Sequence, residues 1–248
     1  MFRMAAMACL LVSFVPPWAA AQPVGIGPVD LELVLAADGS GSIDDEELRF
    51  QREGYAAAVT SPRVLDAIRS GPLGRIALAF TEWGGADSQH VIVDWMVVED
   101  EPSAAAFAEA LVAAPRAASG WNSIGGAIDH AAVLLRTNGI EGLRMVIDVS
   151  GDAPHYGGRP VTAARDEAVL AGITINALAI AAPGGGRPGY QAEPLEDNYE
   201  REVIGGFGAF VVTADEGTSF RDAVLAKMVR EIAGLPGPRV VVASSDPE

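Results

Sequence analysis

The segment Leu31–Ser42, LELVLAADGSGS, constrains the fold more than any other part of the chain. Six of the seven residues from 31 to 37 are apolar, which predicts a strand buried on both faces in the middle of a parallel sheet. The strand ends in Asp38, and Ser40 and Ser42 follow at alternate positions with glycines between them. Carboxylate and hydroxyl oxygens suit Mg²⁺, Mn²⁺ or Ca²⁺, and ligands bind at the carboxyl ends of strands in open α/β sheets. The segment predicts either a metal site or a serine-rich turn before a helix cap.

Two later segments, together with this D-x-S-x-S segment, resemble the metal-ion-dependent adhesion site of von Willebrand factor A domains. That site is built from three loops: D-x-S-x-S after the first strand, a threonine before a middle helix, and an aspartate after the fourth strand. Residues 120–128, GWNSIGGAI, resemble the second loop, G-x-T-x-I-G-x-A-[LI], with Asn122 at the position of the threonine. Residues 146–153, VIDVSGDA, place Asp152 at the aspartate of the usual T-D-G.

The resemblance extends from about Val29 to Gly234 and implies a three-layer, Rossmann-like α/β fold. Three shorter segments are similar to a secreted bacterial branch of these domains whose function is not known: EWGG at 82–85, VIDVSGD at 146–152 and VIGGFGAFVV at 203–212.

A set of metal ligands follows from the resemblance: Asp38, Ser40, Ser42, Asn122 and Asp152. The family's aspartate of the third loop acts on the ion through water, so Asp152 is expected to contribute less than Asp38. Mg²⁺ is the expected divalent cation, with Mn²⁺ or Ca²⁺ as alternatives.

Asn122 departs from the family pattern, in which a threonine hydroxyl binds the ion. The amide carbonyl of Asn can also bind Mg²⁺ or Ca²⁺, but the side chain is longer and has to be placed differently. If the loop shifts by a residue or more, the hydroxyl of Ser123 or Ser119 takes this role instead.

Three residues are expected around the ion: Glu82, Ser123 and His155. Glu82 ends the second predicted strand, where it either hydrogen-bonds the metal loops or has no part in the site. His155 follows Asp152 on the rim, as a ligand contact or as an ordinary loop residue. Asp148 falls inside the fourth strand, where an unpaired carboxylate is costly, so we expect it to hydrogen-bond within the structure. None of the three histidines has the spacing of a zinc motif.

The apolar pattern predicts a mainly parallel central sheet with helices on both faces and one antiparallel edge strand, residues 90–98. The turn at 84–87 is short, so the strands on either side of it should be antiparallel neighbours. A long helix follows Ser42, with carboxylates in its first turn, and is interrupted or ended at 61–62. The other predicted strands are 75–83, 143–149, 173–180 and 209–212, and the other predicted helices are 102–114, 123–135, 161–170 and 220–233.

The ends of the chain are expected to lie outside the domain. Residues 1–21 have the early positive charge, apolar stretch and small-residue ending of a secretory signal peptide, or of a retained anchor. Cleavage after Ala21 removes the one cysteine, Cys9, so the mature chain has no disulfide and depends on its core for stability. Cleavage also leaves a mature chain that is expected to carry no membrane span and to be periplasmic or secreted. The domain is expected at 28–234 and a loose tail at 235–248. Residues 182–189 read as a flexible glycine-rich loop without the ending of a phosphate loop.

The net charge of −16 disfavours nucleic acid and anionic membranes as partners. The resemblance implies a binding module in which an acidic residue of a protein partner completes the metal coordination. A metal-dependent hydrolase is the first alternative, but there is no G-x-S-x-G motif, and the metal motif supplies two carboxylates and no recognisable partnered base. A structural domain with a degenerate metal site is the second alternative.

Overall fold

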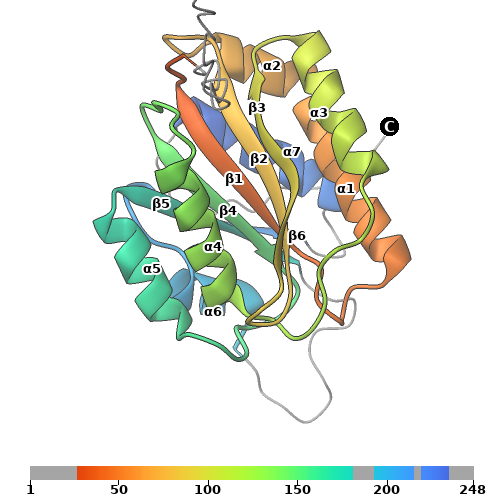
Figure 1. The fold of residues 1–248 in the computed structure, drawn as a ribbon, viewed down its shortest axis with the longest axis vertical. Helices are drawn as coiled ribbons and strands as arrows, with labels where there is room; N and C mark the ends of the chain where they lie inside the picture. Colours follow the sequence, from red (N-terminus) through yellow and green to blue (C-terminus); the bar gives the residue numbers. More distant parts are fainter. Residues whose placement is uncertain (1–26, 181–192, 215–218, 235–248) are drawn as a thin grey trace, which may run out of the picture.

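The computed structural model describes residues 27–180, 193–214 and 219–234. Within them, one central sheet of six strands is covered by helices on both faces (Figure 1). The strands are β1 (Leu31–Asp38), β2 (Ile76–Trp83), β3 (Gln89–Val98), β4 (Met145–Gly151), β5 (Ile173–Ile180) and β6 (Val211–Ala214). Their order across the sheet is β3-β2-β1-β4-β5-β6.

The predicted sheet is confirmed in its essentials. All eight residues of β1 are buried, and β1 pairs in parallel with β2 on one side and β4 on the other. β2 pairs with β3 in the antiparallel sense across a short turn, which makes β3 the antiparallel edge strand. The central position of β1 carries Asp38 to the middle of the edge where the parallel strands end.

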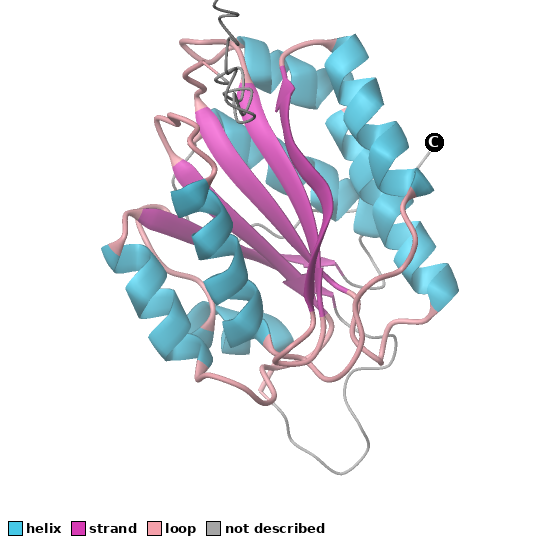
Figure 2. Ribbon diagram, in the orientation of Figure 1, coloured by secondary structure: helices cyan, strands magenta, loops and turns pink. Residues whose placement is uncertain are grey.

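The helices divide between the two faces of the sheet (Figure 2). They are α1 (Asp45–Val59), α2 (Pro62–Arg69), α3 (Glu101–Ala113), α4 (Ile124–Thr137), α5 (Val161–Leu170), α6 (Leu195–Glu202) and α7 (Phe220–Ala233). Apolar residues of α1, α2, α3 and α7 pack with Leu31, Leu33 and Leu35 of β1. Those of α4, α5 and α6 pack with Val34 and Ala36, which point to the opposite face because side chains alternate along a strand. The result is the three-layer arrangement expected from the sequence.

Several predicted boundaries were wrong, and two helices were not predicted. The strand expected at 143–149 spans Met145–Gly151, and the one expected at 209–212 spans Val211–Ala214. The break at 61–62 starts α2: Ser61 caps it and Pro62 occupies its first turn, where proline loses no helical hydrogen bond. α6 has the sequence LEDNYERE, which is too short and too polar for a clear apolar period, although its Tyr199 is fully buried.

Asp148 has the internal partner expected for a carboxylate inside a strand. Its Oδ1 lies 2.5 Å from Nζ of Lys227 on α7, and the same Nζ lies 2.5 Å from Oε1 of Glu231. Asn176 of β5 donates to Glu231 Oε1 over 2.9 Å. All four side chains are buried. Burial and then the charge of Glu231 raise the pKa of Asp148 to about 7, because one ammonium serves two carboxylates.

Some predictions fall on residues that the structure does not describe. They are the signal peptide at 1–21, the glycine-rich loop at 182–189 and the tail at 235–248. In the described part of the chain, no helix is both long and apolar enough to cross a membrane.

Candidate metal centre

The residues predicted from the D-x-S-x-S segment and the third loop meet at the carboxyl ends of β1 and β4. Asp38 is the last residue of β1, and β4 ends at Gly151, directly before Asp152. Ser40 N donates to Asp38 Oδ1 over 2.8 Å, Ser40 Oγ lies 3.0 Å from Ser42 Oγ, and Ser42 Oγ donates to Asp152 Oδ1 over 3.2 Å. These contacts join four of the five predicted ligands into one cluster.

Asp38 has the least favourable electrostatic environment in this cluster. Its side chain is fully buried, and its Oδ2 has no hydrogen-bond partner among the described residues. Burial raises its pKa to about 7, the hydrogen bonds from Ser40 oppose that rise, and the charge of Asp152 adds to it. A buried carboxylate oxygen that faces a second carboxylate is stabilised by a cation, so this pair fits a divalent metal.

Exposure increases across the cluster. Asp38 and Ser40 are buried, Asp152 is half-buried and Ser42 is exposed. The cluster therefore has a protein side at Asp38 and an open side at Ser42, as a site needs if a ligand from outside is to reach it.

The second loop is hydrogen-bonded to both of the others. Gly41 N donates to Gly120 O over 2.8 Å, and Tyr156 N donates to Asn122 O over 2.6 Å. The side-chain oxygen of Asn122 is buried and lacks a hydrogen-bond partner in the described residues, as Asp38 Oδ2 does. Two such oxygens on adjoining loops are the kind of donor that a hard cation takes.

The two serines weighed against Asn122 have other contacts. Ser123 is fully buried, and its hydroxyl donates to Gly157 O over 3.2 Å, which ties the second loop to the third. Ser119 is exposed, and its backbone bonds with Gly85 and with the Ser88 hydroxyl. These contacts leave Asn122 as the second-loop residue with an unpaired buried oxygen.

Glu82 holds part of the site in place through an ion pair with Arg52. Its carboxylate is fully buried and pairs with Arg52 of α1, at 2.8 Å from Nε and 2.6 Å from Nη2. Arg52 also donates to the carbonyls of Ala114 and Pro115, the latter over 3.0 Å. Glu82 Oε2 accepts from Ala117 N at 3.5 Å. Glu82 thus fixes the segment that leads into the second loop.

His155 has a structural contact with the second loop. Its Nδ1 accepts from Gly125 N over 3.3 Å in the first turn of α4, where Ser123 makes no side-chain cap. Burial lowers the pKa of His155, which favours the neutral ring that this bond requires.

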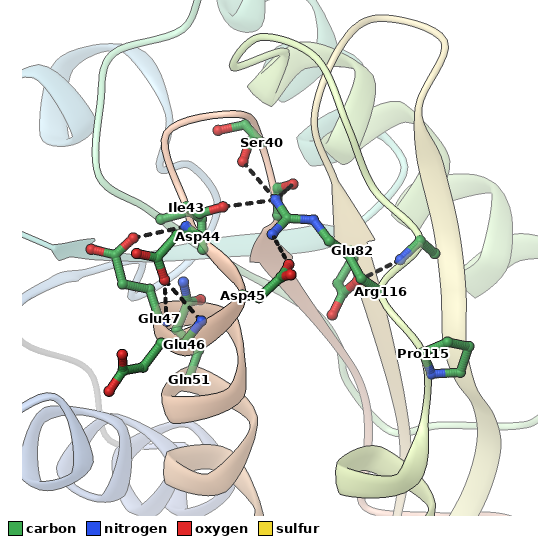
Figure 3. Close-up of polar contacts among 12 residues, drawn as sticks. Ser40, Ile43, Asp44, Asp45, Glu46, Glu47, Gln51, Glu82, Pro115 and Arg116 are labelled. Carbon is green, nitrogen blue, oxygen red and sulfur yellow. Dashed lines mark hydrogen bonds and ion pairs between the residues drawn. The ribbon is translucent and has the colours of Figure 1, made fainter.

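Arg116 is a residue of the site that sequence reasoning missed. Its Nη2 donates to the carbonyls of Gly39, Ser40 and Ile43 over 3.1, 3.1 and 2.7 Å, and its Nη1 pairs with Asp45 over 2.9 Å (Figure 3). One guanidinium therefore holds the D-x-S-x-S loop and the start of α1. A lone arginine more than seventy residues from these partners carries no signal in the sequence.

No group of three or more His, Cys, Asp or Glu side chains in the described ranges is arranged to hold a metal ion. The cluster has two carboxylates, and its other donors are hydroxyl and amide oxygens. This composition favours a hard cation over zinc or copper.

The fold and the three joined loops define an α/β domain of the von Willebrand factor A type. The chain belongs to the family described as "Protein of unknown function (DUF1194)", whose pattern matches residues 28–236. No curated protein is similar enough in sequence to count as a match.

Three solved structures illustrate the shared fold. A von Willebrand factor type A protein from Catenulispora acidiphila superposes with a TM-score of 0.52 at 16% identity, covering 83% of this chain and 42% of that one. The pilus adhesin SpaC from Lactobacillus rhamnosus GG gives 0.57 at 16% identity, over 84% and 31% of the two chains. Proximal thread matrix protein 1 of the mussel byssus, with a zinc-occupied MIDAS motif, gives 0.53 at 15% identity, over 83% and 45%. This chain thus spans less than half of each.

Proposed function

We propose that the protein is an exported module that binds another protein through a divalent cation, with a carboxylate of the partner completing the coordination. The observation that carries this proposal is Asp38 Oδ2, a buried carboxylate oxygen without a hydrogen-bond partner among the described residues. It lies beside a second carboxylate, Asp152, whose proximity adds to the raised pKa of Asp38. Two close carboxylates, one of them buried, lower the stability of the metal-free fold, and a bound cation would stabilise them.

The residues that would hold the cation are Asp38, Ser40, Ser42 and Asn122, with Asp152 acting through water. Mg²⁺ is the cation that we expect, because all of these donors are oxygens. When bound, the cation supplies an open coordination position for an acidic oxygen from another protein. Two carboxylates nearly neutralise a divalent ion, but the open coordination position still attracts a third negative group at short range.

The names of two structural neighbours agree with this proposal: one is a pilus adhesin, and another has a MIDAS motif occupied by zinc. Export rests on the signal-like residues 1–21.

Binding is favoured over hydrolysis by the role of His155. A metal-dependent hydrolase needs a base within reach of its water, and the ring nitrogen Nδ1 of His155 already accepts from the backbone of α4. The remaining alternative, a structural domain with a degenerate site, predicts that the protein does not bind metal at all.

A capture experiment tests the proposal. The purified protein is immobilised and exposed to the periplasmic and surface proteins of its host with Mg²⁺ or with a chelator, beside Asp38→Ala and the exposed-surface control Glu53→Ala. With Mg²⁺, we expect wild type and Glu53→Ala to retain the same proteins, and with the chelator we expect both to lose them. Asp38→Ala should fail to retain these proteins even with Mg²⁺. An identical captured set under all conditions contradicts the proposal.

A further inference from the structure

Two large aromatic side chains are exposed next to the candidate metal centre. Trp121 is 77% exposed and directly precedes Asn122, and Tyr156 is 70% exposed and follows Asp152 by four residues. Single exposed apolar residues are common on protein surfaces and need no explanation. Two aromatic rings on two different loops of the same candidate site are a more specific arrangement.

Backbone hydrogen bonds hold both aromatic residues against the metal loops. Trp121 lies between Gly120, whose carbonyl accepts from Gly41 N over 2.8 Å, and Asn122, whose carbonyl accepts from Tyr156 N over 2.6 Å. Gly120 has a φ of +93°, and a Cβ on it would lie 3.0 Å from Gly85 N, so this part of the loop is closely packed on its neighbour. The rings are therefore presented from fixed backbone, which lowers the entropy lost when a partner binds them.

The charged groups around this face are mainly acidic. α1 begins three residues after Ser42 with Asp45, Glu46 and Glu47, all exposed. The nearby guanidinium of Arg116 is paired with Asp45. Arg159, three residues after Tyr156, is paired with Asp129 and Glu167. A partner thus meets aromatic rings and carboxylates around the ion, and the net charge of −16 repels a partner that is acidic throughout.

We propose that the protein recognises a protein segment in which one aspartate or glutamate is flanked by apolar side chains, with basic residues further out. The carboxylate binds the cation, the apolar side chains pack on Trp121 and Tyr156, and the basic residues complement the acidic groups at the start of α1. The carboxylate part rests on the proposed function, whereas the apolar part rests on the exposed rings.

Four fluorescein-labelled peptides serve as probes. The parent has the core Lys-Leu-Asp-Leu-Lys, and the others replace Asp by Asn, both Leu by Ser, or both Lys by Glu. Their dissociation constants are measured by fluorescence anisotropy with Mg²⁺ and with EDTA, against wild type, Trp121→Ala and Tyr156→Ala. Phe207→Ala is the matched control, because Phe207 is an aromatic residue, 89% exposed, outside the three metal loops.

We expect the parent peptide to bind wild type and Phe207→Ala equally, and Trp121→Ala about tenfold more weakly, the effect of losing about 1.4 kcal/mol of contact energy. Tyr156→Ala should also weaken the binding of the parent peptide. With Mg²⁺ present, the Ser-flanked and Glu-flanked peptides should bind wild type more weakly than the parent does, and the Asn peptide, which lacks the carboxylate for the cation, should bind worst. Equal affinity of the Leu- and Ser-flanked peptides, an unchanged constant in Trp121→Ala, or no binding of the parent up to about 1 mM overturns the inference.

The two levels of the proposal fail in different ways. If EDTA or the Asn peptide leaves the affinity unchanged, the metal-dependent function is wrong, whatever the aromatic variants show. If metal dependence holds but Trp121→Ala binds as wild type does, only the apolar specificity is wrong.

Discussion

Replacing Asp38 by Asn should stabilise the metal-free protein at alkaline pH. A rise in pKa from 3.8 to about 7 on folding means that the ionised Asp38 lowers stability above pH 7 by about 4 kcal/mol, at 1.36 kcal/mol for each pKa unit. Because the folded-state value is the higher one, this cost is absent below about pH 4 and grows as pH rises to 7. Asn keeps an oxygen for Ser40 N, and it offers an N–H to Asp152 in place of a like charge.

The assay is urea unfolding in EDTA at pH 8 and pH 5, with Glu53→Gln as an exposed control. We expect Asp38→Asn to gain up to about 4 kcal/mol at pH 8, about 8–16 °C in Tm, and no more than about 1.5 kcal/mol at pH 5. In matched samples without EDTA, Mg²⁺ at a hundred times its dissociation constant should add about 2.7 kcal/mol to the stability of wild type and nothing to that of Asp38→Asn. A variant that is destabilised at pH 8 by 1 kcal/mol or more, on the order of one hydrogen bond, would falsify this reasoning.

Three further predictions concern the supports of the site and the buried charges. Glu82→Gln leaves Arg52 uncompensated in the interior and should cost about 3–5 kcal/mol in urea unfolding, while the joint replacement of both residues by apolar ones recovers most of it; a loss below about 1 kcal/mol contradicts a buried pair. Arg116→Ala removes three hydrogen bonds to backbone carbonyls of residues 39–43 and should weaken Mg²⁺ affinity at least about tenfold, with partial recovery in Arg116→Lys. Unchanged affinity in calorimetry means that the loop holds its shape without this arginine. The stability of Asp148→Asn relative to wild type should increase as pH rises from about 4 to 7, because Lys227 then pairs with one carboxylate only. A difference in unfolding free energy that stays constant with pH is the contrary result.

The parts of the fold that the sequence predicts are those with a strong local signal. The apolar run of β1, which only Glu32 interrupts, identifies a central strand, and the short turn before β3 identifies the antiparallel edge. α6 was missed because its polar sequence has no period, and its one buried aromatic residue, Tyr199, is held by packing from elsewhere in the chain. The bounds of β4 were missed by two residues at each end, because Leu143 extends the apolar pattern past Arg144, and the strand continues through Ser150 and Gly151, which are not apolar.

The candidate site divides in the same way. Asp38, Ser40, Ser42 and Asp152 have a recognisable spacing, and the structure brings them together. Arg116 was not predicted, because it acts through backbone carbonyls, which every residue has. Only the folded chain brings a distant guanidinium to three particular carbonyls.

Calorimetric titration of Mg²⁺ into the chelator-treated protein tests the central proposal most directly, with Asp38→Ala titrated beside wild type. We predict one Mg²⁺ bound per wild-type chain and no detectable binding in Asp38→Ala, whose circular dichroism should match that of wild type. The contrary result is a wild-type protein that takes up no Mg²⁺, Mn²⁺ or Ca²⁺, or an Asp38→Ala variant that binds with the same affinity.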